Sequence, residues 1–481
     1  MNEPLNKQLD KNVSEMKKRL PSEDIFFYSL RTANGTPCTI VYADGIVDKR
    51  VLGELASRPL TGYADSVTIE NIKKTLPMPE LKEVKDYSEV TEEVLAGNAV
   101  LLLDGLDKAL ALGVKSVPMR AITEPPTDVT VRGPRAGFNE EIKSNMALLR
   151  TKLKTPDLQF VTVTVGRRSA TTVVVCYLDG IAKKEIVDNI ERRLKKIDID
   201  GVPDSSYIAA FLSERRYSLF RSVGTTEKPD ILAAKMLEGR VGILVDGSPI
   251  ALTLPYMLVE DFQAADDYFV TPYKASMTRL LRGLALILSI FLPAFYVAAE
   301  LFKLQLLPQG LLLTVAGSIQ GISLSPSLEM ILTLLVLEVL TEASIRMPKY
   351  VGLALSVVGA LVLGDTAVNA GFLSTPAILI IALSGIWLYT VPDFIETTSV
   401  IRLVMLLFAG SIGTYGIVLF SAFLLYYLFS SESYGTPLLA PFSPMGGHDL
   451  KDSLIKYNMQ ELCLRPKVFN GKNKVRLKNE D

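Results

Sequence analysis

The stretch GLALILSIFLPAFYVAA, Gly283–Ala299, decides the fold class of this chain. It carries no Asp, Glu, Lys or Arg and lies between Arg282 and Glu300. A helix needs roughly 20 mostly apolar residues to cross about 30 Å of hydrocarbon. Two further long stretches, Thr366–Pro392 and Leu403–Ser431, are also free of charged residues. We therefore expect an α-helical, multi-pass membrane part after residue 282 and a large polar part before it.

The composition supports this division and excludes several functions. The chain has 481 residues, 21% of them charged, and a formal net charge of −1, yet its mean hydropathy is +0.29. No global basic field suggests nucleic acid. The cysteines are widely spaced and His448 is the single histidine, so the sequence predicts no metal site, disulfide framework or cofactor. Met1–Pro21 lacks the apolar core of a cleaved signal peptide, so we expect the polar part to be cytoplasmic.

The polar part contains an internal repeat. Cys38–Leu55 and Val174–Ile190 each read as a β-rich run, an Asp-Gly turn, and a charged segment with helical spacing. Glu92–Val114 and Lys235–Pro255 form a second matching pair, in which a buried strand, an Asp-Gly turn and another strand follow a helix end. Glycine accepts the positive φ that such turns need, and the turn glycines are Gly45, Gly105, Gly180 and Gly247. The order predicts two tandem, related α/β subdomains.

These patterns give a division of the whole chain. It consists of a polar N-terminal tail (1–20), a first α/β subdomain (21–118), a linker and connecting helix (119–157), a second α/β subdomain (158–273), a transmembrane helical domain (274–431) and a cytoplasmic C-terminal tail (432–481). Helical spacing predicts the connecting helix from about Phe138 to Leu153 and an amphipathic helix over Lys183–Lys196.

A basic turn precedes the connecting helix. Its residues are Arg132, Gly133, Pro134 and Arg135. Arginines at a helix start can bind phosphate, but they can also pair with neighbouring carboxylates or form a subunit contact. The segment lacks the glycines and the lysine of a P-loop, and we interpret the turn as a candidate assembly or coupling site.

The membrane part carries charges where they are costly. Glu338, Glu342 and Arg346 stand four residues apart, so a helix places them on one stripe. They indicate a water-filled pathway, an ion-pair network between subunits, or a helix lying at the interface. Asp365 lies in a Gly-rich stretch and is either a pathway residue or a hydrogen-bond donor or acceptor between helices.

Prolines and basic residues constrain the spans. Pro293 lies inside the first span and Pro348 ends the charged helix, and both are candidate coupling positions. Leu304–Leu328 is a weak span with two prolines, predicted to be broken or re-entrant. Basic residues mark the cytoplasmic side of a membrane protein. They precede the first span and fill the C-terminal tail, so we expect both termini to be cytoplasmic, with four to six spans.

Six motifs together resemble one family. In chain order they are EPPTDVTVRGPRAGFNEEIKSNMALLR (124–150), LEGRVGILVDGSP (237–249), LPYMLVEDFQAADDYFV (254–270), RLLRGLALILSIFLPAFYVA (279–298), LTEASIRMP (340–348) and VGALVLGDTAVNAGFLSTP (358–376). Their order and extent resemble the A subunit of the GerA family of spore germination receptors from endospore-forming bacteria. The VDGSP and DDY segments favour a germinant receptor subunit over the related stage V sporulation membrane protein.

The resemblance implies a role and partners. Such subunits sit in the inner membrane of the dormant spore and assemble with a transporter-like B subunit and a lipoprotein C subunit. The complex senses nutrients and triggers ion release. The resemblance further implies a homo-oligomer that forms the ion-conducting part, with monovalent cations as candidate ions. It places the germinant pocket mainly in the B subunit and both termini in the spore core.

The residues are compatible with that role. A channel needs polar groups at membrane depth and closely packed helices, and we expect a pore lined partly by the Glu338 face of its helix. Three alternatives stay open: a non-conducting scaffold subunit, a secondary transporter, and a membrane-anchored enzyme. A transporter needs an inverted repeat, which the membrane part does not display. The polar part shows no nucleophile–base set or phosphate loop, so we expect no enzymatic activity.

Overall fold

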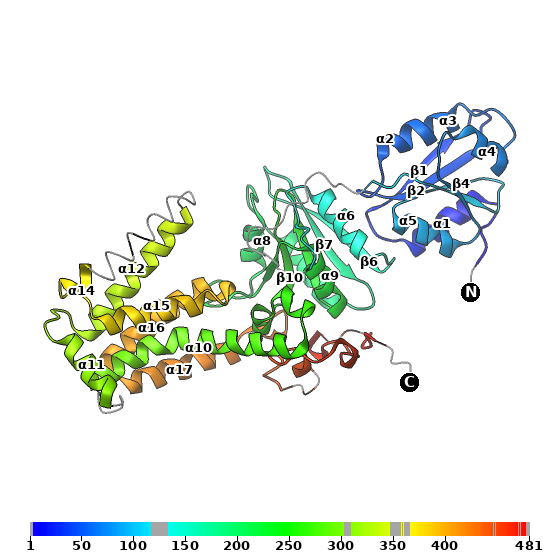
Figure 1. The fold of residues 1–481 in the computed structure, drawn as a ribbon. Coiled ribbons are helices and arrows are strands. Elements are labelled where there is room, and N and C mark those ends of the chain that lie inside the picture. Colours follow the sequence, from blue (N-terminus) through cyan, green and yellow to red (C-terminus); the bar gives the residue numbers. More distant parts are fainter. Residues whose placement is uncertain are drawn as a thin grey trace. The chain divides into compact units, whose positions relative to one another are not determined.

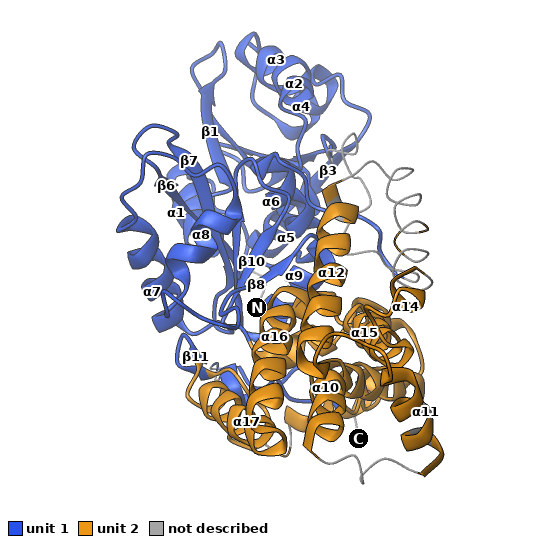
Figure 2. Ribbon diagram, turned by 90° about the vertical axis from the view of Figure 1, so that its left-hand side faces the viewer, with its two compact units in different colours: residues 1–256, 432–436, 462–481 blue, residues 257–431, 437–461 orange. Residues whose placement is uncertain are grey.

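A computed structural model describes residues 3–116, 133–302, 309–346, 357, 359, 366–445, 447, 449–469, 471 and 473–477. The chain forms two compact units, distinguished by colour in Figure 2. The α/β unit comprises Met1–Tyr256, Glu432–Thr436 and Leu462–Asp481. The helical unit comprises Met257–Ser431 and Pro437–Glu461. The predicted fold class, a duplicated α/β part followed by a helical part, is confirmed.

The α/β unit contains two five-stranded antiparallel sheets with the same strand order. The first runs β1-β2-β4-β5-β3 and the second β6-β7-β9-β10-β8. The strands of the first are β1 Ile25–Arg31, β2 Pro37–Ala43, β3 Leu81–Val84, β4 Ala99–Leu103 and β5 Ala109–Leu112. Those of the second are β6 Leu158–Val165, β7 Thr171–Leu178, β8 Gly224–Thr226, β9 Val241–Val245 and β10 Ala251–Leu254. The shared order confirms the tandem repeat.

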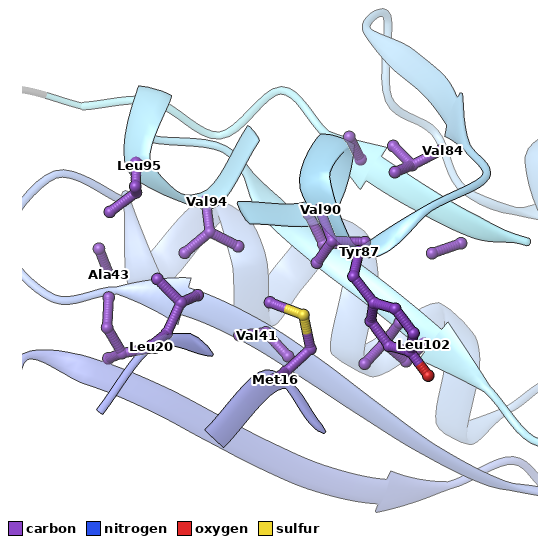
Figure 3. Close-up of a cluster of buried hydrophobic side chains, with 14 of the residues drawn as sticks. Met16, Leu20, Val41, Ala43, Val84, Tyr87, Val90, Val94, Leu95 and Leu102 are labelled. Atoms are coloured by element: carbon purple, nitrogen blue, oxygen red, sulfur yellow. The ribbon is translucent and has the colours of Figure 1, made fainter. Parts of the chain in front are cut away.

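Helices cover both faces of the first sheet, as Figure 1 shows. The α-helices of this unit are α1 Leu9–Arg19, α2 Lys49–Leu52, α3 Arg58–Thr61, α4 Ile69–Thr75, α5 Tyr87–Ala96, α6 Ile142–Lys152, α7 Lys184–Lys195, α8 Ser205–Leu212 and α9 Pro229–Glu238. The π-helix η1 Gly53–Ser57 joins α2 to α3, and the 3-10 helix η9 covers Lys467–Phe469. Successive residues of a strand face opposite sides of a sheet. In β4, Val100 and Leu102 therefore join the cluster under α1 and α5 (Figure 3), whereas Leu101 and Leu103 join the one under α2–α4. This explains why β4 reads as a continuous apolar run.

The predicted Asp-Gly turns are confirmed. Gly45, Gly105, Gly180 and Gly247 have φ between 76° and 86°, a region that glycine enters without steric cost. The aspartates of two of these turns also accept hydrogen bonds from helix starts. Asp104 Oδ1 accepts from Leu9 N at 3.0 Å and Asp246 Oδ1 from Ile142 N at 3.3 Å. These two aspartates therefore fix the N-terminal ends of α1 and α6.

The same contacts show that α1 and α6 are equivalent. Asn12 of α1 exchanges two hydrogen bonds with the backbone of Asn6, at 2.8 and 2.6 Å. Asn145 of α6 exchanges two with Asn139, at 2.9 and 2.6 Å. The segment taken from sequence as a polar tail, residues 1–20, therefore contains the first helix of the first repeat. Its polar composition hid this role because only one face is buried, through Leu9, Asn12 and Met16. We propose that each repeat begins with this helix.

Two predicted helix bounds differ from the structure. Helix α6 begins at Ile142, four residues after the predicted Phe138, because Asn139 is held in the loop by Asn145. Helix α7 covers Lys184–Lys195, within one residue of the prediction at each end.

The helical unit is built around α10 Pro272–Phe302, which packs most extensively against α15 and α16. Its other elements are the 3-10 helices η2 Leu258–Phe262, η3 Ala265–Phe269, η6 Pro392–Phe394, η7 Asp449–Lys451 and η8 Met459–Glu461, and the helices α11 Gln309–Ile319, α12 Pro326–Arg346, α14 Ala367–Asn369, α15 Thr375–Leu388, α16 Ile395–Ile412 and α17 Thr414–Phe429. Pro293 is buried inside α10.

Two helices within the described residues are long and apolar enough to cross a membrane, namely Pro272–Phe302 and Pro392–Ile412. Helices Thr375–Leu388 and Thr414–Phe429 are apolar but shorter. The predicted four to six spans therefore stay a proposal.

The uncharged run Leu403–Ser431 is two helices, not one. Gly413 has a φ of 65° and separates α16 from α17. A Cβ on Gly413 would lie 2.7 Å from the Phe302 ring, and one on Gly416 would clash with the Phe408 carbonyl oxygen. Hydropathy alone could not reveal this break, because glycine does not interrupt an apolar run.

Candidate functional site

The start of α10 is held by a cluster of buried charges, which we call the α10 clasp. It consists of Asp267 in η3, Arg279 and Arg282 in α10, and Asp452 and Lys456 in the C-terminal segment of the helical unit. Arg279 and Arg282 come immediately before the uncharged run that begins at Gly283. Since α10 has 31 residues, it is about 46 Å long, which is longer than the apolar core of a membrane, about 30 Å. The clasp lies at the end of α10 that precedes the uncharged run.

Arg279 is the centre of the clasp. Its side chain is 0% exposed and its Nε donates to Asp267 Oδ2 at 3.1 Å. Its Nη1 donates to Asp452 Oδ1 at 3.0 Å and to the Ser453 carbonyl at 2.8 Å. A buried arginine needs such partners because an uncompensated charge is costly to remove from water. The fold of the C-terminal segment against α10 therefore depends on this side chain.

Asp267 binds both arginines. Arg282 forms a bidentate pair with it, through Nη1 at 2.7 Å and Nη2 at 2.8 Å, and Lys456 Nζ donates to its backbone carbonyl at 2.6 Å. Burial by itself raises the pKa of Asp267, but the hydrogen bonds and charges of Arg282 and Arg279 outweigh it and lower this pKa below its usual value. Asp267 is therefore ionised at neutral pH, as the clasp requires.

A second buried arginine lies among the apolar helices. Arg402 of α16 donates through Nη2 to Glu338 Oε1 of α12 at 2.6 Å and through Nη1 to Ser384 Oγ of α15 at 3.0 Å. Ser384 in turn donates to the Ser289 carbonyl of α10 at 2.7 Å. We call these four residues the Arg402 network. It links the four helices through polar contacts and places a charge pair inside the helical unit.

The predicted charged stripe of Glu338, Glu342 and Arg346 does not form one network, because its two carboxylates bind different arginines. Glu338 binds Arg402, whereas Glu342 binds Arg346 on its own helix at 2.5 Å. The side chains of Glu342 and Arg346 are 59% and 77% exposed, and that of Glu338 is 33% exposed. Two further predicted positions, Pro348 and Asp365, lie outside the described residues.

The basic turn lies in the α/β unit, and its first residue, Arg132, is outside the described residues. Gly133 has a φ of 121°, and the Pro134 carbonyl accepts a hydrogen bond from Lys228 Nζ at 3.1 Å. This contact ties the turn to the residue that precedes α9. Roles of Gly133, Pro134 and Arg135 in assembly stay a prediction.

Sequence reasoning missed several of these residues. Arg402 directly precedes the uncharged run Leu403–Ser431, and a charged residue at that place was the available signal. Asp267 lies in the DDY segment, and Asp452 lies in the basic tail, so nothing local distinguished them. Arg279 and Asp452 contact each other although they are more than 170 residues apart in the sequence. No local pattern could therefore reveal this pair.

These features define a class of protein: a duplicated α/β unit joined to an apolar helical unit that contains buried ion pairs. Within that class, the chain belongs to the Bacillus/Clostridium GerA spore germination protein family, whose profile matches residues 11–468. The resemblance seen in the sequence motifs is thereby confirmed.

Relatives match over nearly the full length. An uncharacterized membrane protein of Bacillus subtilis, YfkQ, is 35% identical, with 95% of this chain and 90% of that protein covered. Spore germination protein KA of the same organism is 32% identical, with 97% and 88% covered. Its spore germination protein B1 is 30% identical, with 98% and 99% covered.

One solved structure is similar to part of the chain. It is the N-terminal domain of the A subunit of the Bacillus megaterium spore germinant receptor GerK3, with 26% identity and a TM-score of 0.42. The match covers 54% of this chain and 98% of that domain.

Proposed function

We propose that this chain is the A-type subunit of a nutrient germinant receptor in the spore membrane. The family match across residues 11–468 is the observation that carries this role. In this proposal the chain assembles with a transporter-like B subunit and a lipoprotein C subunit and has both termini in the spore core. It has no enzymatic role.

We further propose that the helical unit, as a homo-oligomer, conducts monovalent cations when the receptor binds a germinant. The Arg402 network supports this step. A charge pair among apolar helices is costly, and Glu338 keeps a third of its side chain exposed. A carboxylate that binds an arginine and is still partly exposed can line an ion pathway. In the proposal, neighbouring copies of the chain complete this pathway.

The α10 clasp supports a coupling role. It joins η3, the start of α10 and the C-terminal segment through Arg279. A movement of any of these three segments therefore changes the contacts of α10, the longest helix of the unit. In the proposal, germinant binding by the partner subunit shifts the clasp, and α10 passes the shift to the Arg402 network.

Spores carrying Glu338→Gln or Arg402→Gln test the conduction step. Either change removes one charge of the pair, and we expect the initial rate of potassium release after nutrient addition to fall by about tenfold or more, or about 1.4 kcal/mol in barrier height. Potassium in the medium is measured continuously, and immunoblots confirm equal receptor levels. Glu396→Gln is the matched control, because Glu396 is exposed on the same helix as Arg402.

Two outcomes separate the alternatives. Normal potassium release from both variants, together with no nutrient germination in a deletion strain, supports the non-conducting scaffold. Normal nutrient germination in the deletion strain contradicts the receptor role itself.

A further inference from the structure

A second polar group lies inside the helical unit, with contacts separate from those of the Arg402 network. Its members are Tyr296 and Glu300 near the end of α10, Glu329 in the first turn of α12, and Ser374 at the N-cap of α15. Tyr296 and Glu300 are each 7% exposed, and Glu329 and Ser374 are each 1% exposed. Tyr296 belongs to a buried apolar cluster with Val297, Met330 and Ala377, which follow or precede the other members of the group by one to three residues.

The two carboxylates are satisfied unequally. Glu329 Oε1 accepts a hydrogen bond from the backbone N–H of Ser374. Within the described residues, neither carboxylate oxygen of Glu300 has a hydrogen-bond partner, and neither does the Tyr296 hydroxyl. Tyr296 and Glu300 are four residues apart on α10, so they lie on the same face of the helix. The hydroxyl lies close enough to the carboxylate to interact with it, but the geometry is not that of a hydrogen bond.

Glu329 makes the position of Glu300 less favourable. Its carboxylate lies close enough to interact electrostatically with that of Glu300. The buried arginines of the unit have other partners: Arg402 binds Glu338 and Ser384, and Arg279 binds Asp267 and Asp452. A buried charge is tolerated only when it is compensated. The pair therefore needs either a proton or a positive charge, and no side chain in the described part of the chain supplies that charge.

The chemistry of the group indicates which charge fits. Its free ligand atoms are oxygens, which hard cations prefer over nitrogen or sulfur. The described residues contain no cluster of three or more Asp, Glu, His or Cys side chains, so the site offers two carboxylates and a hydroxyl, and water would complete the shell of a bound ion. Among hard cations, the proposed role in cation release selects a monovalent one.

We propose that Glu300 and Glu329, together with the Tyr296 hydroxyl, form a binding site for one monovalent cation inside the helical unit. This inference rests on the proposed role in cation release and names a residue pair for it. The cation holds the end of α10 to the starts of α12 and α15, because these helices supply the three ligands and Ser374. Its departure leaves two like charges facing one another, which favours separation of these helices.

Thermal unfolding of the full-length chain in detergent tests the site directly. At neutral pH and equal ionic strength, we expect the unfolding temperature to be roughly 2–4 °C higher in potassium chloride than in choline chloride, because a ligand that binds only the folded state stabilises it. Choline is too large to enter a site between packed side chains.

Glu300→Gln and Glu329→Gln remove one charge each without changing side-chain shape. We expect both variants to lose the difference between potassium and choline. In choline, Glu300→Gln unfolds at the same temperature as the unchanged chain or higher, because the uncompensated charge is gone. A variant that simply failed to fold would unfold at a lower temperature in both salts. Glu396→Gln, on exposed α16 surface, keeps the full difference.

Equilibrium dialysis with radioactive rubidium gives a second readout. We expect one ion retained per chain, displaced by potassium but not by choline, and none retained by Glu300→Gln. Absence of both rubidium retention and the potassium effect overturns the proposal, as does stabilisation that follows pH but not the cation. A deletion strain that still germinates on nutrients overturns the receptor role but leaves a positive rubidium result intact.

Discussion

Each unit contains a buried arginine that is paired with a carboxylate. We call the pair closed where both side chains are buried and open where the carboxylate is partly exposed. In the α/β unit, Arg150 of α6 binds Asp24, which precedes β1, with Nη2 and Oδ1 2.7 Å apart. In the helical unit, Arg402 binds Glu338 at 2.6 Å. Both arginines are almost fully buried, but the side chain of Asp24 is 2% exposed and that of Glu338 is 33% exposed.

The hydrogen bonds differ in the same way. All three guanidinium nitrogens of Arg150 donate, to Asp24, to Ser22 Oγ and to the carbonyls of Thr155 and Leu158. Nε of Arg402 has no partner within the described part of the chain. The closed pair joins the two repeats and has no group left for another partner. In the open pair, Arg402 Nε and the exposed part of Glu338 can still bind another group, as a functional site requires.

The largest expected loss of stability comes from removing the arginine of the closed pair. Arg150→Met leaves Asp24 buried without its partner, which should cost about 3–5 kcal/mol of unfolding free energy. Chemical denaturation of the chain, followed by circular dichroism, measures the loss. The double variant Arg150→Met, Asp24→Leu should recover much of it, because two apolar residues avoid the unpaired charge. No recovery would mean that the Arg150 hydrogen bonds to the backbone matter more than the pair.

Arg402→Met applies the same change to the open pair. We expect a loss of about 1–3 kcal/mol, smaller than for Arg150→Met, because the exposed part of Glu338 can reach water. The same measurement is made in detergent and in lipid vesicles. A loss equal to that of Arg150→Met in vesicles would show that the exposed part of Glu338 faces lipid, and would contradict a pathway there.

Acidification tests the α10 clasp, in which Asp267 is the shared carboxylate. Because the pKa of Asp267 is lowered in the folded state, its contribution to stability is present above the unfolded pKa of about 3.9 and is lost as the pH falls through the folded pKa. Asp267→Asn should therefore be less stable than the unchanged chain at neutral pH. The difference should shrink as the pH falls below about 4. Unfolding temperatures measured from neutral to acidic pH check this, and a constant difference would contradict it.

The smallest effect is expected at the exposed pair. Glu342 and Arg346 are bound to each other on one helix with most of each side chain in solvent. Arg346→Gln should change the unfolding free energy by less than about 0.5 kcal/mol. An effect as large as that of Arg402→Met would show that another copy of the chain, or a partner subunit, covers this surface.

Much of the fold could be predicted from local patterns. The Asp-Gly turns at Gly45, Gly105, Gly180 and Gly247 need only a residue that accepts positive φ, and the strands beside them need only apolar runs. The uncharged stretch after Arg282 predicted the longest helix. These features depend on neighbours in sequence, so one chain was enough to find them.

Other features could not be predicted because they depend on distant partners. The helix α1 looked like a polar tail since most of its surface is solvated, and its equivalence to α6 became visible only through the paired contacts of Asn12 and Asn145. The break at Gly413 depends on the Phe302 ring that occupies the space beside it. The stripe predicted at Glu338, Glu342 and Arg346 was divided by Arg402, which lies 64 residues from Glu338.

The sequence by itself determined where charge is absent, where the chain turns and that its first half is duplicated, because each of these is set by side-chain type within a few residues. The tertiary structure alone decided which charges meet. Asp267, Arg279 and Asp452 form a clasp, and Glu300 lies near Glu329, only because packing brings separate helices together. The energy of a buried charge is set by its surroundings in space, which no local pattern records.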